Sequence, residues 1–368
     1  MNPLIALDIG LGPDLERAIR RCVDAGEAFC VLDRRLAPRR RDEELSLLGA
    51  TAVEDESGRT SRLGTPVDDE IGLVMLTSGS SGPAKAAELG WDALAASAAL
   101  TQSTLRGDHR PVWYPCLPAN HIGGLAVVLR AVWGEADLLW GDPAELDTAP
   151  ARGATHASVV RPQLARHDLN GFAKVLLGGA RAPQDRPGNV IATWGMTETG
   201  SGVVYDGRPL PGVEVAAVEG ELCLRSPTLF RSYRHAPRPA VTGPDGRGDW
   251  FPTGDAGEVV DGLVSVHGRL EFVINTGAEK VWPDDLEAVL ASLKGVRDVA
   301  VTGVEDPEWG ERVVALVVGD GSNLDEAILA AADEGIGPWA KPKEVRYVAA
   351  IPRTANGKIR RGQLENLF

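Results

Sequence analysis

Residues 71–85 read IGLVMLTSGSSGPAK, an apolar run that passes directly into a loop of glycine and hydroxyl side chains and ends on a lysine. A short apolar run bounded by such a turn signal is typical of a buried strand, here residues 71–76. In the loop that follows, glycines let the backbone turn and expose N–H groups, while the hydroxyls and Lys85 add further donors. The loop 77–85 therefore suits a polyphosphate. It is not a Walker A loop, because the spacing GxxxxGK followed by Ser or Thr is absent.

On both sides of this stretch, short apolar runs alternate with helical patterns through the first two thirds of the chain, which favours an α/β architecture. The stretch 34–70 is rich in Arg and then in Asp and Glu, and we expect it to form a helix and a solvated loop. Elsewhere in this part we expect helices at 13–24, 91–105 and 125–132, and strands at 29–32, 136–140, 175–177 and 190–193.

Beyond about residue 205 the pattern changes to short strands separated by Gly, Pro and Asp turns, expected at 213–218, 221–225, 256–260 and 263–267. The last 100 residues predict a compact α+β segment, with helices at 284–293 and 324–334 and strands at 299–304, 312–318 and 344–348. A segment of that length is enough for a small domain of its own. We therefore expect a large unit at 1–268 and a small one at 269–368.

The composition is that of a globular protein, since 43% of the 368 residues are hydrophobic and 24% are charged. The formal net charge of −14 argues against a nucleic-acid binder, which needs a basic face. Four scattered cysteines without a CxxC pair predict neither a zinc site nor a disulfide scaffold. No apolar run approaches the length of a membrane span, and the first ten residues lack the features of a signal peptide. We therefore expect a cytoplasmic protein with reduced thiols.

Four further motifs follow the loop: WGMTETG at 194–200, FPTGD at 251–255, GRLE at 268–271 and PRTANGK at 352–358. Each is ambiguous alone, because a Ser/Gly loop is more often an ordinary turn and a single acidic residue is more often a turn cap or a solvated charge. In this order and at these spacings, however, the chain resembles the superfamily of adenylate-forming enzymes. That superfamily contains acyl- and aryl-CoA ligases, luciferases and peptide-synthetase adenylation domains.

The resemblance implies a fold and a set of ATP contacts. The fold is a large N-terminal ATP- and acid-binding domain of layered sheets and helices with a β-rich subdomain, 1–268, and a small mobile α+β domain, 269–368, with a hinge near 269–272. Asp255 would accept hydrogen bonds from the ribose hydroxyls, and Glu198 would bind Mg²⁺, a hard cation that suits a carboxylate. The implied ATP or AMP contacts are Thr77, Ser78, Gly79, Ser80, Ser81, Gly82, Lys85, Gly178, Gly179, Ala180, Trp194, Gly195, Met196, Thr197, Asp255 and Arg269.

The resemblance also implies two steps at one carbon: ATP adenylates a carboxylate with loss of pyrophosphate, and the thiol of CoA then displaces AMP. Lys358 is the clearest catalytic candidate, because a cation there offsets the repulsion between the carboxylate and the α-phosphate. Thr197 would also contact the α-phosphate. The small domain would rotate about Glu271 between the steps, so that Gly277 and Ala278 line the tunnel for the pantetheine arm. In the family, Asp or Lys is more usual at the position of Glu271, and glycine is more usual at the position of Ala278. The thioester step therefore has weaker support than adenylation.

The segment PCLPANHIGG at 115–124 matches the family's acyl pocket, and His121 would complete the catalytic set of Lys358, Thr197 and Glu198. Arg130 interrupts an apolar pattern and Arg161 follows one, and a guanidinium can bind a second carboxylate bidentately. An ordinary exposed or ion-paired Arg remains an open interpretation for Arg130 and is favoured for Arg161. The implied substrate contacts are His121, Gly123, Gly124, Arg130, Gly200 and Ser201.

With 76 residues before the loop, the HIGG segment and the spacing to Arg130, the chain looks most like the o-succinylbenzoate–CoA ligases of menaquinone biosynthesis. That likeness implies 2-succinylbenzoate, ATP and CoA as partners, and Mg²⁺ as cofactor. Another aryl- or acyl-CoA ligase and a carrier-protein acyl-AMP ligase are alternatives. A non-catalytic nucleotide-binding protein is disfavoured, because Glu198, Asp255, Arg269 and Lys358 are all present. The sequence leaves the oligomeric state open, a homo-oligomer included.

Overall fold

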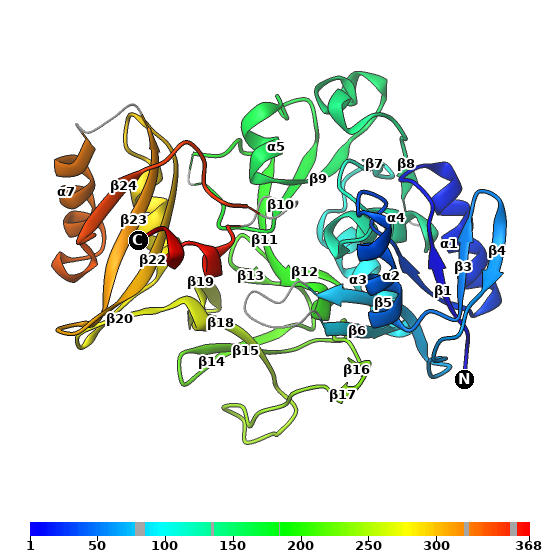
Figure 1. Cartoon of the computed structure of the whole chain (residues 1–368). Helices are drawn as coiled ribbons and strands as arrows, with labels where there is room; N and C mark the ends of the chain where they lie inside the picture. Colours follow the sequence, from blue (N-terminus) through cyan, green and yellow to red (C-terminus); the bar gives the residue numbers. More distant parts are fainter. Residues whose placement is uncertain (78–84, 134–135, 184, 320–323, 354–358) are drawn as a thin grey trace.

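Two large sheets share one layer of helices over the first two thirds of the chain (Figure 1). The computed structural model describes residues 1–77, 85–133, 136–183, 185–319, 324–353 and 359–368. The first sheet has the strand order β17-β16-β6-β5-β2-β1-β3-β4. Its strands are β1 (Leu4–Leu7), β2 (Ala28–Val31), β3 (Ala52–Asp55), β4 (Gly58–Ser61), β5 (Ile71–Thr77), β6 (Lys85–Gly90), β16 (Ser232–Tyr233) and β17 (Ala236–Pro237).

The second sheet has the order β13-β12-β11-β10-β9-β7-β8. The strands from β8 to β11 are parallel, and β12 and β13 continue the sheet in antiparallel pairing. The bounds are β7 (Val112–Tyr114), β8 (Asp137–Leu138), β9 (His156–Val160), β10 (Lys174–Gly178), β11 (Val190–Met196), β12 (Ser201–Tyr205) and β13 (Arg208–Pro209).

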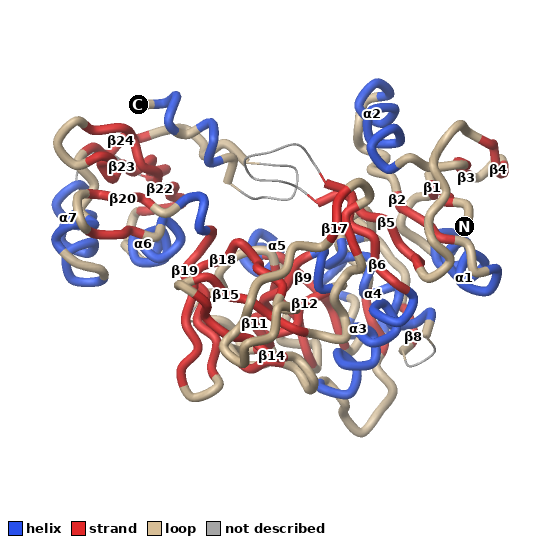
Figure 2. The backbone as a smooth tube through the Cα atoms, turned by 90° about the horizontal axis from the view of Figure 1, so that it is seen from below, coloured by secondary structure: helices blue, strands red, loops and turns tan. Residues whose placement is uncertain are grey.

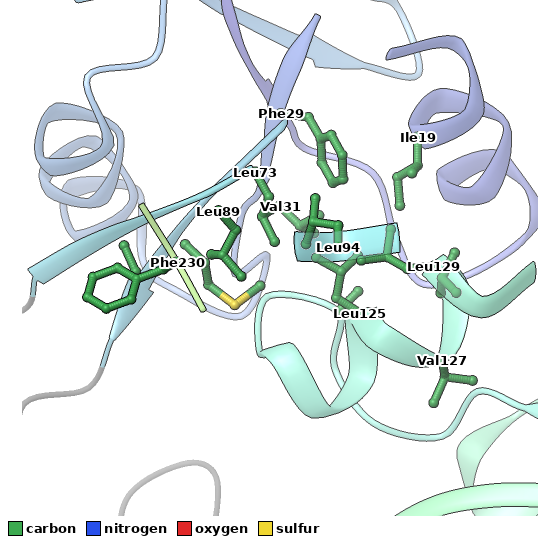
Figure 3. Packing of buried hydrophobic residues seen from close by; sticks show 14 of the residues in the cluster. Ile19, Phe29, Val31, Leu73, Leu89, Leu94, Leu125, Val127, Leu129 and Phe230 are labelled. Atoms are coloured by element: carbon green, nitrogen blue, oxygen red, sulfur yellow. The ribbon is translucent and has the colours of Figure 1, made fainter. Parts of the chain in front are cut away.

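The shared helical layer consists of α1 (Pro13–Ala25), α3 (Trp91–Thr104) and α4 (Ile122–Val132). Because α4 is packed against α1 and α3 on one side and β9 and β12 on the other, its middle is apolar all round. Figure 3 shows part of the resulting core, where Ile19 of α1, Leu94 of α3 and Leu125 of α4 lie together with residues of the first sheet such as Phe29 and Leu73. Strand β5 alternates between two clusters: Leu73 faces this core, whereas Val74 packs with Leu45 and Leu48 of α2 (Pro38–Leu48).

Two smaller sheets complete the chain. The third is antiparallel, in the order β14 (Glu214–Val218), β15 (Glu221–Arg225), β18 (Phe251–Val260) and β19 (Leu263–Arg269). The fourth lies at one end of the molecule with α6 (Pro283–Ala291) and α7 (Asp325–Gly335) on one face (Figures 1 and 2). Its strands are β20 (Ile274–Thr276), β21 (Glu279–Val281), β22 (Val296–Asp306), β23 (Gly310–Gly319) and β24 (Glu344–Tyr347).

The prediction for 34–70 is wrong in one part, because the expected solvated loop contains the hairpin β3–β4. Strand β3 pairs with β1 in parallel and buries the carboxylate of Glu54, which forms ion pairs with Arg21 and Arg59. Sequence polarity conceals such a strand, since the burial of its charge depends on Arg21 of α1 as well as on Arg59 of the same hairpin. The strand expected at 136–140 covers only Asp137–Leu138, and α5 (Arg161–Arg166) begins at Arg161.

The remaining expectations about the chain as a whole are simple to report. The four cysteines are free and buried, as the scattered spacing predicts. Within the ranges that the structure describes, no helix combines the length and the apolar character needed to traverse a bilayer.

Candidate active site

The motif WGMTETG forms a tight connection between β11 and β12. Its turn is the 3-10 helix η3 (Thr197–Thr199), closed by Gly200 with φ +66°. The Thr199 hydroxyl accepts a hydrogen bond from the Met196 amide at 2.9 Å and donates one to the Ser201 carbonyl at 2.7 Å. A Cβ on Gly195 would come within 2.3 Å of the Ser201 carbonyl oxygen, so only glycine fits there. Thr199 thus holds the turn, and the preceding Thr197 and Glu198 are presented by it.

The carboxylate of Glu198 contacts Tyr233, which in turn lies beside Lys85. It is 8% exposed, and the hydroxyl of Tyr233 in β16 donates a hydrogen bond to its Oε1 at 2.9 Å. Lys85 Nζ lies 5.1 Å from the centroid of the same tyrosine ring. Burial, followed by the Glu198 carboxylate, raises the pKa of Tyr233 above its ordinary value, so the phenol remains a donor. Tyr233 therefore links the end of the loop 77–85 to the motif 194–200.

The loop itself is described only at its two ends. Thr77 ends β5 and is paired with Lys85, the first residue of β6. The predicted ATP contacts Ser78, Gly79, Ser80, Ser81 and Gly82 lie outside the described residues. The structure thus brings the two ends of the loop to the part of the first sheet where β16 pairs with β6.

Asp255 joins two motifs that are far apart in the sequence. Its Oδ2 accepts a hydrogen bond from Trp194 Nε1 at 2.8 Å, and its Oδ1 lies 3.2 Å from Arg269 Nε. Asp255 and Arg269 are also directly paired across β18 and β19. Arg269 donates to the carbonyl of Thr253 at 2.6 Å as well. Three of the predicted nucleotide contacts therefore form one hydrogen-bonded cluster.

The segment 178–180 begins with the last residue of β10, at the carboxyl end of the parallel strands. Gly179 has φ +83°, and Leu177 accepts a hydrogen bond at 3.1 Å from the hydroxyl of Thr193 in the neighbouring β11. The carboxyl ends of β10 and β11 thus lead side by side into Gly178–Ala180 and the motif 194–200. Loops at this edge of a parallel sheet are where ligands usually bind in α/β proteins.

The first residue after this segment contacts the C-terminal part of the chain. Arg181 forms an ion pair with Oδ1 of Asp285 in α6, and His267 Nδ1 lies 3.4 Å from Oδ2 of the same carboxylate. Asp285 therefore bridges the loop after β10 and the strand β19 to the unit built on the fourth sheet.

His121 is the N-cap residue of α4. Its Nε2 lies 3.2 Å from Asn120 Nδ2. Gly123 is exposed, whereas Gly124 is buried where a Cβ would come within 2.3 Å of the Pro118 carbonyl oxygen. The two glycines thus have different surroundings, and Gly124 allows the helix to start close to the preceding chain.

Arg130 is 2% exposed in the middle of the helical layer, which excludes the interpretation as an ordinary surface arginine. Its guanidinium lies 3.5 Å from Ser158 Oγ and 3.4 Å from Ser201 Oγ. Its Nε has no hydrogen-bond partner, and no carboxylate of the described residues is within ion-pair distance. Burial lowers the pKa of Arg130 to about 10, so it is still a cation at neutral pH. Arg161, in contrast, is exposed at the start of α5.

Lys358 lies outside the described residues, so its predicted role is untouched by the structure. The residues after it are anchored by Arg361, which pairs with Asp284 and Glu287 of α6. Gly277 turns the hairpin β20–β21 with φ +66°, and the adjacent Ala278 is exposed. Glu271 lies in the short helix η4 (Leu270–Phe272), directly after β19.

Sequence reasoning missed two residues that lie against the predicted site. Tyr233 lies in the two-residue strand β16, and 34 residues separate it from Glu198 in the sequence, so no local motif links the two. Trp113, whose ring lies over the Arg130 guanidinium, is an apolar residue in a three-residue strand and carries no motif. No local pattern in the sequence indicates that Tyr233 contacts Glu198 or that Trp113 contacts Arg130.

Two family models match most of the segments that form this site. Residues 22–234 match the AMP-binding enzyme family, and residues 285–358 match the AMP-binding enzyme C-terminal domain. The chain belongs to the AMP-binding enzyme family. This confirms the resemblance inferred from the five motifs.

Curated relatives in the family point to one activity. The chain is 36% identical over 338 residues to the probable 2-succinylbenzoate–CoA ligase of Mycobacterium tuberculosis (strain H37Rv), covering 83% of this chain and 87% of that one. It is 32% identical over 312 residues to the 2-succinylbenzoate–CoA ligase of Escherichia coli (strain K12), covering 77% of this chain and 66% of that one.

Solved structures of the family confirm the predicted fold class. The o-succinylbenzoate CoA synthetase of Bacillus subtilis in complex with the acyl-adenylate intermediate OSB-AMP superimposes with a TM-score of 0.86 at 21% identity, covering 99% of this chain and 88% of that chain. ATP-bound MatB from Rhodopseudomonas palustris gives a TM-score of 0.84 at 21% identity, covering 100% and 89%.

Proposed function

We propose that the chain is an AMP-forming acid–CoA ligase that converts 2-succinylbenzoate to 2-succinylbenzoyl-CoA in menaquinone biosynthesis. A carboxylate oxygen of the succinyl group attacks the α-phosphorus of ATP, and pyrophosphate leaves. The thiol sulfur of CoA then attacks the acyl carbon, the thiol proton is lost, and AMP leaves. Family membership supports the first step, and the activity named for the relatives supports the acid and the thiol.

The observation that carries the choice of acid is the environment of Arg130. A cation that is 2% exposed and paired with no carboxylate of the described residues is costly to bury, and two hydroxyls at 3.4 and 3.5 Å satisfy it only in part. A dicarboxylic acid supplies the missing anion when its second carboxylate forms a bidentate pair there. Ser201 lies at the guanidinium and directly follows the motif 194–200 in the sequence. One acid would therefore reach from the motif, where its first carboxylate reacts, to Arg130, where its second carboxylate binds. In 2-succinylbenzoate the ring carboxylate is this second group.

The residues around Glu198 fit a magnesium ion bound chiefly through phosphate and water oxygens. No group of three or more His, Cys, Asp or Glu side chains suited to a metal occurs among the residues that the structure describes. A single buried carboxylate whose other neighbour is a hydroxyl donor is what Mg²⁺ uses when a nucleotide supplies further ligands. Glu198 would hold the ion, and the ion would neutralise charge on the phosphates of ATP.

The remaining roles in the site are part of the same proposal. Thr197 contacts the α-phosphate, His121 lies at the carboxylate that reacts, and the cluster of Asp255 and Arg269 holds the ribose. Lys358 stabilises the charge that develops as pyrophosphate leaves. The chain divides at 268/269, and the smaller part rotates near 269–272 so that Gly277 and Ala278 approach the acyl group for the second step.

A panel of acids tests the proposal, with pyrophosphate release and CoA-dependent AMP formation as readouts. The panel contains 2-succinylbenzoate, 4-oxo-4-phenylbutanoate (the same acid without the ring carboxylate), benzoate and a fatty acid. We expect 2-succinylbenzoate to give the highest kcat/KM, and Arg130→Gln to lower that value by about 100-fold while sparing 4-oxo-4-phenylbutanoate. Turnover of benzoate or the fatty acid without turnover of 2-succinylbenzoate would contradict the assignment. Adenylation without any use of CoA would favour a carrier-protein acyl-AMP ligase.

A further inference from the structure

The guanidinium of Arg130 rests on an aromatic ring to which neither the motifs nor the family resemblance gives a role. Its Cζ lies 4.2 Å from the ring centroid of Trp113 in β7. Trp113 is 1% exposed, so water does not weaken the contact. An indole face attracts a cation through the ring quadrupole, and the attraction increases when both groups are desolvated. Trp113 thus stabilises the Arg130 charge in addition to the hydroxyls of Ser158 and Ser201.

Stacking on a ring covers a face of the planar guanidinium and leaves the N–H groups on its rim free for acceptors in the same plane. Two of these groups approach Ser158 Oγ at 3.5 Å and Ser201 Oγ at 3.4 Å, which is the long end of the hydrogen-bond range. The Nε–H has no hydrogen-bond partner. Trp113 therefore limits where the guanidinium can lie, while the N–H groups of Arg130 keep unused capacity for a carboxylate.

The sheet in turn fixes the ring of Trp113. Trp113 is paired with His156 in the parallel register of β7 and β9, and the two ring centroids are 5.0 Å apart. Ser158 follows two residues after His156 and so lies on the same face of β9. The alternate residues Tyr114 and Ala157 belong to a different core cluster, on the other face. One face of two neighbouring strands thus presents the ring and one hydroxyl to the arginine of α4.

The other titratable groups packed around Arg130 are neutral at neutral pH. Burial, followed by the charge of Arg130, lowers the pKa of His156 to about 4. Burial also raises the pKa of Tyr205, whose hydroxyl lies 3.0 Å from Thr101 Oγ1. The cluster of Trp113, Arg130, His156, Ser158 and Ser201 therefore carries one positive charge, which matches one added carboxylate.

We propose that Trp113 is a positioning residue that sets the preference of the enzyme for acids with a second carboxylate. It holds the Arg130 guanidinium flat against β7, with the rim directed to Ser158 and Ser201, and so orients it for a bidentate pair. The inference rests on the proposed function in one respect, that Arg130 binds the second carboxylate.

The test compares two acids in wild-type enzyme, Trp113→Phe and Trp113→Leu. Initial rates of pyrophosphate release are measured with 2-succinylbenzoate and with 4-oxo-4-phenylbutanoate. We expect Trp113→Leu to raise KM for 2-succinylbenzoate about tenfold with kcat unchanged, and to leave both constants for the monocarboxylic acid within about twofold. Trp113→Phe keeps an aromatic face, so its KM is expected to rise only about threefold. Trp91→Leu, at a tryptophan that packs on the same core over Gly72, is the matched control and leaves the ratio of the two acids unchanged.

The role of Trp113 is overturned if Trp113→Leu leaves the ratio of the two acids unchanged, whether activity with both acids falls equally or with neither. Failure of the proposed function looks different, because wild-type enzyme then shows no preference for 2-succinylbenzoate over 4-oxo-4-phenylbutanoate. If Trp113→Leu does not fold, binding of both acids to Trp113→Phe by calorimetry decides the question. Weaker binding of the dicarboxylic acid alone supports the inference, and wild-type binding of both acids overturns it.

Discussion

Replacing Tyr233 by Phe removes one hydroxyl from beside the carboxylate of Glu198 and leaves the other ring contacts in place. The lost hydrogen bond is 2.9 Å long and reaches a side chain that is 8% exposed. The ring keeps its packing on Phe230, with centroids 4.8 Å apart, and its position under Lys85 Nζ. The substitution therefore tests the hydroxyl and little else.

The size of the effect follows from the charge of the acceptor and from its burial. A hydrogen bond to a charged group contributes about 1.5–3 kcal/mol, and each 1.4 kcal/mol corresponds to about a factor of ten. Groups that orient a metal ligand typically change metal affinity by about 10- to 100-fold when removed. We therefore expect the half-saturating Mg²⁺ concentration of Tyr233→Phe to rise about 10- to 100-fold, with kcat at saturating Mg²⁺ within about threefold of wild type.

Two measurements check this expectation: a Mg²⁺ titration of pyrophosphate release, and calorimetry of ATP binding with and without Mg²⁺. Tyr347→Phe is the matched control, because its hydroxyl also donates to a carboxylate, that of Asp325, at 2.6 Å in the C-terminal part of the chain. We expect the control to have the wild-type Mg²⁺ dependence. If Tyr233→Phe has the wild-type Mg²⁺ dependence in both measurements, the hydroxyl does not orient a metal ligand and the reasoning is refuted.

Three further predictions concern other parts of the molecule. Lys358→Ala is expected to slow acyl-adenylate formation at least ~100-fold while transfer to CoA from supplied adenylate largely survives, and equal loss of both steps would contradict its role. Because the pKa of His156 in the folded chain is about 4, below its ordinary value, the unfolded chain takes up this proton first; stability from this group is complete above about pH 6.5 and is lost as the pH falls toward 4. Between pH 7 and pH 4, the free energy of unfolding measured with urea should therefore fall by up to about 3 kcal/mol more in the wild type than in His156→Gln. Parallel pH dependences of the two proteins would exclude the effect. Asp285→Asn weakens the contacts to Arg181 and His267, and we expect about two- to fivefold faster proteolysis between the third and fourth sheets; an unchanged cleavage rate would show that these contacts do not hold the two parts together.

The sequence was sufficient for those features that depend on local pattern. Residues 71–76 form a strand because an apolar run ends at glycine and hydroxyl residues, and the motif 194–200 contains the glycines that its turn needs. The cluster of Trp194, Asp255 and Arg269 was predicted only as separate contacts to a nucleotide, since their mutual hydrogen bonds depend on how the second and third sheets meet.

Features that depend on partners distant in the sequence could not be predicted. The hairpin β3–β4 has polar residues that become strand-forming only beside β1, where Arg21 and Arg59 neutralise Glu54. The sequence does not decide the burial of Arg130, because a charged residue in an apolar helix pattern also fits the edge of an exposed face. Its stacking on Trp113 follows from the packing of α4 against the second sheet, which no local pattern specifies.

The depth at which Arg130 lies also determines how the enzyme should respond to salt. At a net charge of −14 the protein repels ATP, CoA and a dianionic acid at long range, and mobile ions screen this repulsion over about 10 Å at 0.1 M ionic strength. Salt ions do not reach a guanidinium that is 2% exposed, so its attraction for a carboxylate is largely unscreened. With Arg130 at the second carboxylate, as proposed, moderate salt should speed the encounter with anionic substrates without weakening the binding of the acid. A protein that attracts its ligands with surface charge shows the reverse behaviour.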